Sequence, residues 1–366
     1  MQLSTENACT RDDHDKVFEM IMASLGSQVI RTLALLSVAE HLHGAALTAD
    51  QIAARESSDP EMTYRLLRAA AALGFLAYQA DTGVFAGTAL LDVLRADSPL
   101  SLKFYAQTAP GPAFWLPNLL MPETVMSGKT GVVEALGSTV FEYFAKHEDQ
   151  ARMFSSAMTN LSTPVIREAV AAIEVKDAHF AVDVGGADGA FIAELLQHNP
   201  GLTGAVLDLP QVIPGVSKAA QAHGLESRMA GAVGDFFAEV PSADMYVLKF
   251  VLHDWDDESC IKILSNIRNA MRPGAGVFIV EMAITSATSV SATLMDMAML
   301  ASFTGQEREL SHFESLLHSA GLKIVEAVPL HPPYFLIAAD LGTQNATSNL
   351  GTSVMVGRRT NRSRLK

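Results

Sequence analysis

The segment VDVGGADGAF, residues 182–191, constrains the fold of this chain more than any other. Its apolar start predicts a buried strand, residues 185–189 predict a tight turn, and residues 190–198 predict a helix whose first amides point toward a ligand. Asp208 ends a second apolar strand about twenty residues later, where a carboxylate can bind both hydroxyls of a ribose. The segment predicts a nucleotide-type pocket at a sheet edge, although the same glycine pattern also occurs in plain strand-to-helix connections.

Strand and helix patterns alternate between residues 178 and 340, which predicts a doubly wound α/β sheet. The last two apolar runs are separated only by VPLHPP, residues 328–333, so these strands are expected to pair antiparallel. Ligands of such sheets bind beyond the carboxyl ends of the strands. The cofactor-binding residues predicted there are Gly185, Gly186, Asp208, Leu209, Gly234, Asp235, Phe236 and Lys249. We expect Asp235 to bind an adenine amino group, Phe236 to stack on the ring and Lys249 to meet an α-carboxylate.

Residues 16–100 show two helices followed by a hairpin, a pattern typical of a winged helix. Asp59 and Pro60 predict the start of the longer helix, and Gly74 predicts its end. Many winged helices bind DNA, but residues 15–95 contain nine acids and six bases, a net charge of −3, and lack a basic stripe. The region is therefore expected to be a packing and dimerisation module.

The composition limits the classes of partner and the location of the protein. A net charge of −14 argues against nucleic acid or an anionic membrane as the main partner, and a hydrophobic fraction of 49% indicates a sizeable subunit interface. Only two cysteines are present, with no recognisable signal peptide and no long uninterrupted apolar run, so a cytoplasmic protein is expected. The predicted regions are a flexible N-terminus (1–15), a winged-helix-like dimerisation domain (16–100), a helical linker and substrate lid (101–177), a cofactor-binding domain (178–340) and a disordered tail (341–366).

The segment LKFVLHDWDDESC, residues 248–260, gives the sequence a family resemblance. Together with VDVGGADG, LDLP, GDFF and GQER, it resembles the plant-type small-molecule O-methyltransferases and their bacterial and fungal relatives. These matches cover about residues 180–320, and RLLRAAAALGFL extends the similarity to nearly the whole chain. The resemblance implies a Rossmann-like, seven-stranded class I methyltransferase sheet and a winged-helix domain that forms a homodimer. It also implies S-adenosylmethionine as the cofactor and S-adenosylhomocysteine as the product.

The resemblance further implies roles for individual residues. His253 matches the general base, Glu281 and Glu307 match the acids that flank it, and no metal site is expected. A phenolic hydroxyl has a pKa of about 10, so an imidazole with a pKa of about 6.5 can remove its proton as methyl transfer proceeds. The acids within residues 254–258 are expected to cap the next helix.

The acceptor pocket is expected to be apolar and adaptable, because thioethers and rings fit around a flat molecule. The residues that the resemblance implies for its lining are Trp115, Met158, Met295, Met299 and Phe303, although methionines at helical spacing are also typical of a core. These residues favour a planar aromatic acceptor, such as a phenolic polyketide, a flavonoid-like compound or a phenazine.

Three other functions remain open at this point. A member of the same family could have diverged to hydroxylation or decarboxylation. A nicotinamide-dependent dehydrogenase is disfavoured, because Ala187 and Asp188 occupy the turn that would hold a pyrophosphate. A winged-helix regulator that senses a small ligand is disfavoured by the acidic N-terminal region.

Overall fold

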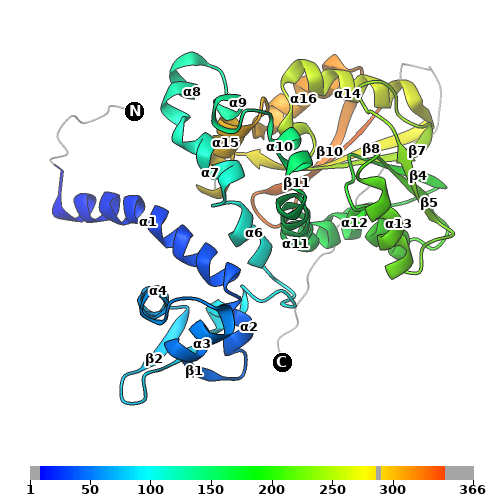
Figure 1. The fold of residues 1–366 in the computed structure, drawn as a ribbon. Coiled ribbons are helices and arrows are strands. Elements are labelled where there is room, and N and C mark those ends of the chain that lie inside the picture. The colour runs from blue at the N-terminus through cyan, green and yellow to red at the C-terminus, as the bar shows by residue number, and fades with distance from the viewer. Residues whose placement is uncertain (1–8, 286–289, 343–366) are drawn as a thin grey trace, which may run out of the picture. The chain divides into compact units, whose positions relative to one another are not determined.

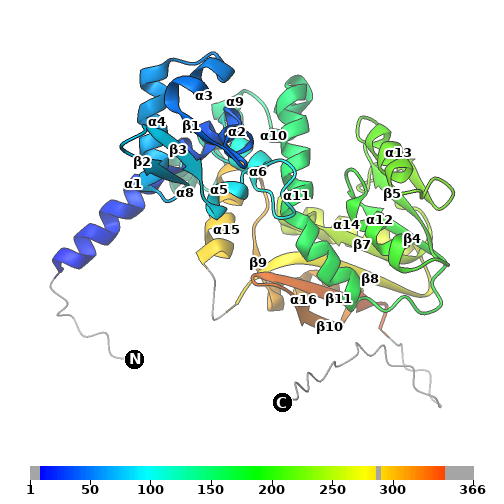
Figure 2. The same cartoon turned by 90° about the horizontal axis from the view of Figure 1, so that it is seen from below.

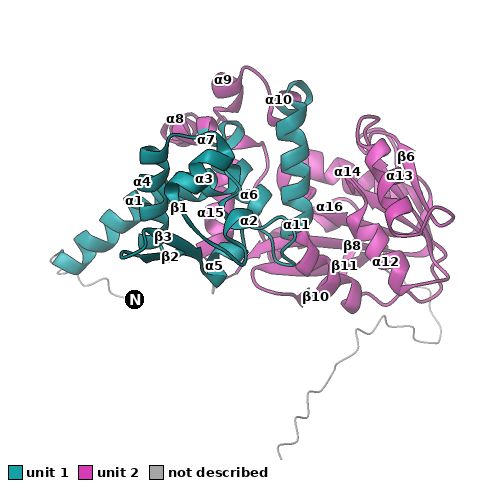
Figure 3. Cartoon of the chain, turned by 60° about the horizontal axis from the view of Figure 1, so that its bottom comes forward, with its two compact units in different colours: residues 1–115, 144–161 teal, residues 116–143, 162–366 magenta. Residues whose placement is uncertain are grey.

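The computed structural model describes residues 9–285 and 290–342, so nearly all of the predicted tail at 341–366 lies outside the described residues. The chain forms two compact units, which are coloured separately in Figure 3. Unit 1 comprises residues 1–115 and 144–161, and unit 2 comprises residues 116–143 and 162–366. The predicted helical region 101–177 is therefore divided between the two units.

Unit 1 opens with a long helix, which is followed by shorter helices and a small sheet. Its first elements are α1 (Arg11–Leu35), α2 (Val38–Leu42), β1 (Ala46–Thr48), α3 (Ala49–Glu56), α4 (Pro60–Ala72), β2 (Leu76–Gln79), β3 (Val84–Gly87), α5 (Ala89–Asp92) and α6 (Lys103–Thr108). Strands β2 and β3 form the predicted hairpin, and β1 pairs antiparallel with β3. Asp59 caps α4 as predicted, because its Oδ1 accepts a hydrogen bond from the Met62 amide at 2.9 Å.

Helix α1 begins at Arg11, inside the segment 1–15 that the sequence predicts to be flexible. The cause is a capping box, in which the Thr10 hydroxyl accepts from the Asp13 amide and the Asp13 carboxylate accepts from the Thr10 amide. Residues 11–15 of that segment are therefore helical.

The middle of the chain is helical, as predicted. It contains α7 (Pro112–Leu119), α8 (Met121–Ser127), α9 (Val132–Leu136), α10 (Val140–Lys146) and α11 (Glu148–Ala172). In unit 1, the rings of Phe114, Phe144 and Phe154 pack with centroids 4.8 to 6.1 Å apart. Aromatic rings at this separation stabilise a core beyond the area that they bury.

Unit 2 is built on a mostly parallel sheet. Its strands are β4 (Phe180–Val184), β5 (Thr203–Asp208), β6 (Met229–Val233), β7 (Ala243–Lys249), β8 (Met271–Ile284), β9 (Arg308–Glu309), β10 (Lys323–Pro329) and β11 (Tyr334–Asp340). Among the described residues, the main order is β10-β11-β8-β7-β4-β5-β6, and β9 pairs parallel with β8. Strand β11 runs antiparallel to both of its neighbours, β8 and β10. The predicted sheet and its terminal antiparallel hairpin are confirmed, and β9 is an addition to them.

Helices cover both faces of this sheet (Figures 1 and 2). They include α12 (Ala190–His198), α13 (Ile213–Ala222), α14 (Asp257–Ala270), α15 (Val290–Ser302) and α16 (Leu310–Ser319), and the 3₁₀ turn η1 spans Leu252–Asp254. Leu195 of α12 and Val216 of α13 pack with the last turns of α11 in one hydrophobic cluster, and Leu264 of α14 and Phe313 of α16 belong to a second. Because the strands from β6 to β8 run parallel, their carboxyl ends lie at one edge of the sheet, where ligands of such sheets bind.

No helix in the described part of the chain is long and apolar enough to cross a membrane.

Candidate active site

The turn after β4 and the acid at the end of β5 hold each other in place. Gly185 and Gly189 have φ values of 68° and 82°, and Ala187 adopts a φ of 51° despite its side chain. The Asp208 carboxylate accepts hydrogen bonds from the Ala187 amide at 3.0 Å and from the Leu209 amide at 2.7 Å. Burial raises the pKa of Asp208, and these two amides oppose the rise. The Ala187 amide is thus engaged by an anion of the chain itself, which leaves the turn poorly suited to a pyrophosphate.

The segment after β6 brings a ring beside this turn. A Cβ atom added to Gly185 would lie 3.5 Å from Cε1 of Phe236, so the ring borders the turn directly. Gly234 leaves room for the side chain of Leu207, since an added Cβ would lie 2.7 Å from its Cδ1. The Asp235 carboxylate accepts a hydrogen bond from the Phe237 amide at 2.8 Å, which orients it at the strand end.

Lys249 lies at the end of β7, with its Nζ 4.5 Å from the centroid of the Phe250 ring. Burial lowers the pKa of Lys249, and the carboxylates of Asp183 and Asp188 are the largest opposing influences. Together, Asp208, Phe236 and Lys249 offer a carboxylate for a ribose, a ring for a purine and an ammonium for a carboxylate. This donor set fits an adenosyl amino acid and requires no phosphate-binding group.

Asp183 is a member of this region that the sequence analysis did not single out. It lies fully buried in β4, where burial raises its pKa to about 7. Gly186 packs on its carboxylate so closely that any Cβ at position 186 would overlap it. The acid two residues before the first glycine of the turn was the available sequence signal for this residue.

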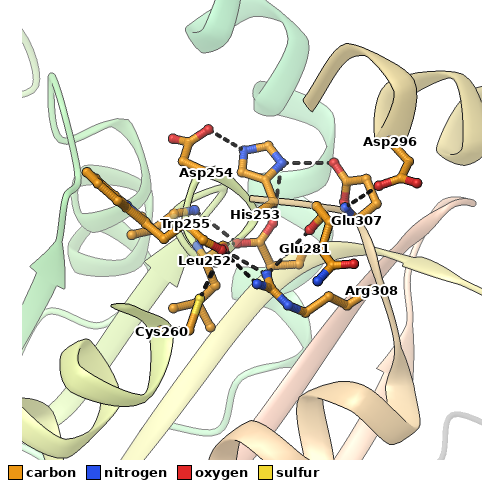
Figure 4. Close-up of polar contacts among 11 residues, drawn as sticks. Leu252, His253, Asp254, Trp255, Cys260, Glu281, Asp296, Glu307 and Arg308 are labelled. Atoms are coloured by element: carbon orange, nitrogen blue, oxygen red, sulfur yellow. Dashed lines mark hydrogen bonds and ion pairs between the residues drawn. The ribbon is translucent and has the colours of Figure 1, made fainter. Parts of the chain in front are cut away.

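The three predicted catalytic residues come together beside η1, as Figure 4 shows. His253 Nδ1 is 2.8 Å from Glu307 Oε1 and 3.9 Å from Glu281 Oε2. A fourth residue joins them, because Asp254 Oδ1 lies 3.6 Å from His253 Nε2. Asp254 was predicted to cap the next helix, but Asp256 does so by accepting from the Ser259 amide. The arrangement surrounds one imidazole with three carboxylates.

These charges decide the protonation of the site. Burial by itself would lower the pKa of His253, but Glu281, Asp254 and Glu307 outweigh it and raise the pKa to about 10. Burial raises the pKa of Glu281 to about 7 and that of Asp254 to about 6, although the imidazolium opposes both shifts. At neutral pH the cluster therefore holds an imidazolium stabilised by its acids.

The backbone around His253 is fixed by groups from β8 and β9. Glu281 Oε1 accepts hydrogen bonds from the Val251 and Leu252 amides, each at 2.9 Å. The guanidinium of Arg308, which is 1% exposed, donates to the carbonyls of Leu252 at 2.8 Å and Trp255 at 2.7 Å. Sequence reasoning quoted Arg308 in the GQER segment but gave it no role, because its partners, the two carbonyls and the Asp257 carboxylate, lie some fifty positions away. The turn that carries His253 is held from both sides.

Gly305 allows the loop before Glu307 to approach this turn, and its replacement should disturb catalysis. A Cβ at Gly305 would overlap the His253 carbonyl and the Trp255 amide. Gly305→Ala is expected to lower kcat by about 100-fold, the cost of roughly 1 Å of misplacement, with S-adenosylhomocysteine binding unchanged. Steady-state kinetics and calorimetry test this, with Gly201→Ala, which faces open space, as the control. Wild-type kcat in Gly305→Ala would contradict the role.

The predicted acceptor residues are distributed over both units. In unit 2, α15 carries Met299, which is buried, and Met295, which packs against a hydrophobic cluster of the sheet. Phe303 follows α15, with its ring 5.8 Å from that of Phe141, and Phe141 stacks on Trp255 at 6.4 Å. The predicted residues of unit 1, which are partly buried on α7 and α11, are Trp115 and Met158.

Taken together, the doubly wound sheet, the glycine turn closed by an aspartate and the adjacent histidine–glutamate pair define an S-adenosylmethionine-dependent methyltransferase. Comparison with known families agrees. A family model described as an O-methyltransferase domain matches residues 121–323, and one described as an O-methyltransferase dimerisation domain matches residues 18–102. The chain belongs to this O-methyltransferase family, and its cofactor is S-adenosylmethionine.

Individual relatives agree over most of their length. The O-demethylpuromycin-O-methyltransferase of Streptomyces alboniger is 30% identical over 344 residues, which is 91% of each chain. The structure of mitomycin 7-O-methyltransferase has a TM-score of 0.84 and 28% identity, covering 89% of this chain and 97% of that one. An O-methyltransferase from neocarzinostatin biosynthesis, in complex with S-adenosylhomocysteine and 1,4-dihydroxy-2-naphthoic acid, has a TM-score of 0.75 and 28% identity, covering 86% and 95%.

Proposed function

We propose that the enzyme methylates a hydroxyl group of a planar aromatic secondary metabolite, with His253 as the general base and without a metal ion. The observation that carries this proposal is the 2.8 Å hydrogen bond between His253 Nδ1 and Glu307 Oε1. A carboxylate on Nδ1 fixes the tautomer and orients the ring, so Nε2 is the nitrogen that can accept a proton.

The chain's own residues prepare the proton transfer. In the proposed reaction, the acceptor hydroxyl loses its proton to His253 Nε2, and the imidazolium that forms is stabilised by Glu307, Glu281 and Asp254. When bound, S-adenosylmethionine supplies an electrophilic methyl group and a sulfonium charge. Asp208, Phe236 and Lys249 would hold its adenosine and amino-acid parts. A nearby cation opposes the carboxylates around His253, so the pKa of His253 falls toward the range in which a base works at neutral pH.

The pH dependence of the reaction should report these acids. His253 must be neutral to act, and its pKa of about 10 in the free enzyme means that kcat/KM for S-adenosylmethionine should rise with pH toward that value. Glu281→Gln removes one negative charge, lowers the pKa of His253 and should shift this rise to lower pH by about 1–3 units. Profiles for the wild type, Glu281→Gln and the exposed control Glu314→Gln measure the shift. An unmoved or upward-moved profile would contradict the electrostatic role.

The same residues could hold a cation, so a metal has to be tested. Ligand atoms of His253, Glu281 and Glu307 lie within 4.8 Å of one another. However, Nδ1 is hydrogen bonded to Glu307, and one Glu281 oxygen already accepts from two amides. We expect dialysis against EDTA to leave kcat unchanged and added Mg²⁺ or Zn²⁺ to give no stimulation. Loss of activity with EDTA, restored by one of these ions, would contradict the metal-free mechanism.

The nature of the acceptor is supported by the names of the relatives and by the apolar side chains. One relative is named an O-demethylpuromycin-O-methyltransferase, another a mitomycin biosynthesis 6-O-methyltransferase, and the neocarzinostatin relative is bound to 1,4-dihydroxy-2-naphthoic acid. Met295, Met299, Phe303, Trp115 and Met158 are the residues that we propose to line the pocket. The direct test is incubation with methyl-labelled S-adenosylmethionine and a panel of phenols, polyketides and phenazines. Label transferred to a hydroxyl supports the proposal, and cofactor binding with transfer to none of them, or to carbon only, contradicts it.

We further propose that the enzyme is a homodimer. Apolar side chains at Val17, Phe18, Ile21 and Leu25 are exposed on α1, and the dimerisation-domain match covers all of them except Val17. Exposed apolar patches of this kind are typical of protein–protein interfaces. A second copy of the chain is therefore expected to cover them.

A further inference from the structure

Unit 1 contains a cavity of about 240 Å³ that the proposed mechanism does not use. Its walls come from α1, α6, α7, α10 and α11, and its apolar lining includes Leu35, Pro112, Phe144 and Met153. The cavity therefore offers an apolar surface and the face or edge of a ring to a small molecule.

Arg31 is the feature that gives this cavity a chemical preference. Among the described residues that line it, Arg31 is the one with a charged side chain. None of the arginine ion pairs formed by the described residues includes Arg31. Its Nε donates to the Gln107 carbonyl at 3.2 Å, and no described residue accepts a hydrogen bond from its two terminal nitrogens. A partly buried guanidinium thus lines the cavity with four terminal N–H donors available.

The wall that carries Arg31 is fixed by further hydrogen bonds. The Gln107 side chain donates to the Ala34 carbonyl at 2.8 Å, and the Gln28 side chain donates to the Pro110 carbonyl at 2.9 Å. The first contact joins α1 to α6, and the second joins α1 to Pro110, which follows α6. In α1, the two contacts lie on either side of Arg31. The helix that carries the guanidinium is therefore already held in place before a ligand binds. The loss of conformational entropy on binding should be small.

We propose that this cavity binds the carboxylate of an aromatic acid. The planar guanidinium matches a carboxylate in two parallel hydrogen bonds, and the apolar walls accept the ring that carries it. The overall charge of −14 repels anions from the protein as a whole. The cavity differs, because it contains a cation and no acid in its described lining, so an anion is favoured there. The acid is either the methyl acceptor or a second ligand. The assignment of the acid as the methyl acceptor rests on the proposed function. The binding of the acid in the cavity does not depend on that function.

Binding without the methyl donor tests this directly. Calorimetry on the full-length enzyme uses 1-hydroxy-2-naphthoic acid and its neutral carboxamide as probes. We expect the acid to bind about tenfold or more tightly than the amide, as charge-assisted hydrogen bonds allow. Arg31→Gln should abolish the preference, Arg31→Lys should keep part of it, and the exposed control Arg65→Gln should leave it intact. Thermal unfolding of each variant checks that the fold persists.

The outcomes separate binding from catalysis. Equal affinity for acid and amide in the wild type, no binding of either, or an undiminished preference in Arg31→Gln would overturn the site. Methylation of neutral phenols, measured in parallel, reports the proposed function independently. If the acid is methylated and Arg31→Gln raises its KM but not that of 1-naphthol, the acid is an acceptor. If it binds through Arg31 without being methylated, the cavity holds a second ligand.

Discussion

Replacing His253 with alanine is expected to lower kcat by a factor of about 10²–10⁴, the usual contribution of a positioned general base. Affinity for S-adenosylhomocysteine should stay at the wild-type level, because the residues proposed to hold the cofactor are Asp208 at the end of β5, Phe236 after β6 and Lys249 at the end of β7, and His253 is not one of them. Transfer of labelled methyl to the acceptor measures kcat, and calorimetry with S-adenosylhomocysteine measures affinity.

The controls for this variant address the charges that it leaves behind. Without the imidazole, Glu281 and Glu307 are buried acids that have lost the cation facing both of them, so circular dichroism must show that the variant is folded. His253→Gln keeps a polar group of similar size and should be as inactive as the alanine variant. His318→Ala, at an exposed position of α16, should behave as the wild type. Full activity in His253→Ala would remove this residue as the base.

Asp208→Ala is expected to raise the Kd of S-adenosylhomocysteine by about 100-fold or more. Two hydrogen bonds from ribose hydroxyls to a carboxylate account for this loss, since each charge-assisted bond contributes about 1.5–3 kcal/mol. The substitution also removes the acceptor for the Ala187 and Leu209 amides, which hold the turn in place. The measurement is calorimetric titration, with kcat/KM falling in parallel.

A second variant separates these two effects. Asp208→Asn keeps one oxygen for an amide of the turn but lacks the negative charge. Its Kd for S-adenosylhomocysteine should therefore lie between that of the wild type and that of Asp208→Ala. Asp177→Asn, an exposed acid of the same unit, is the matched control. Unchanged affinity in Asp208→Ala would contradict the assignment of Asp208 as the ribose ligand.

Most of the fold was predictable from local patterns. The strand, turn and helix at residues 182–198 and the cap at Asp59 rest on signals carried by neighbouring residues. Strand β9 is two residues long and has no periodicity to read, so it emerges only from its pairing with β8. The early start of α1 was readable in principle, because Thr10 and Asp13 have the spacing of a capping box.

Roles in the candidate site were predictable where a side chain of a motif carries chemistry of its own, and not where the role depends on distant backbone, as for Gly305 and Arg308 of the GQER segment. Asp208, His253 and Glu307 stand in recognisable segments. Arg308 acts on carbonyls, which every residue possesses, and Gly305 acts by lacking a side chain at a close approach. The cavity beside Arg31 joins residues more than a hundred positions apart, so no local pattern announces it.

The contacts of Arg308 have a consequence for how such an enzyme can evolve. The guanidinium binds the main-chain carbonyls of Leu252 and Trp255, which substitution of those side chains does not remove. The side chains at positions 252 and 255 can therefore vary while the geometry of the turn that carries His253 persists. Descendants can explore new small molecules one substitution at a time without first losing their chemistry, and engineers who wish to redirect the enzyme can follow the same route.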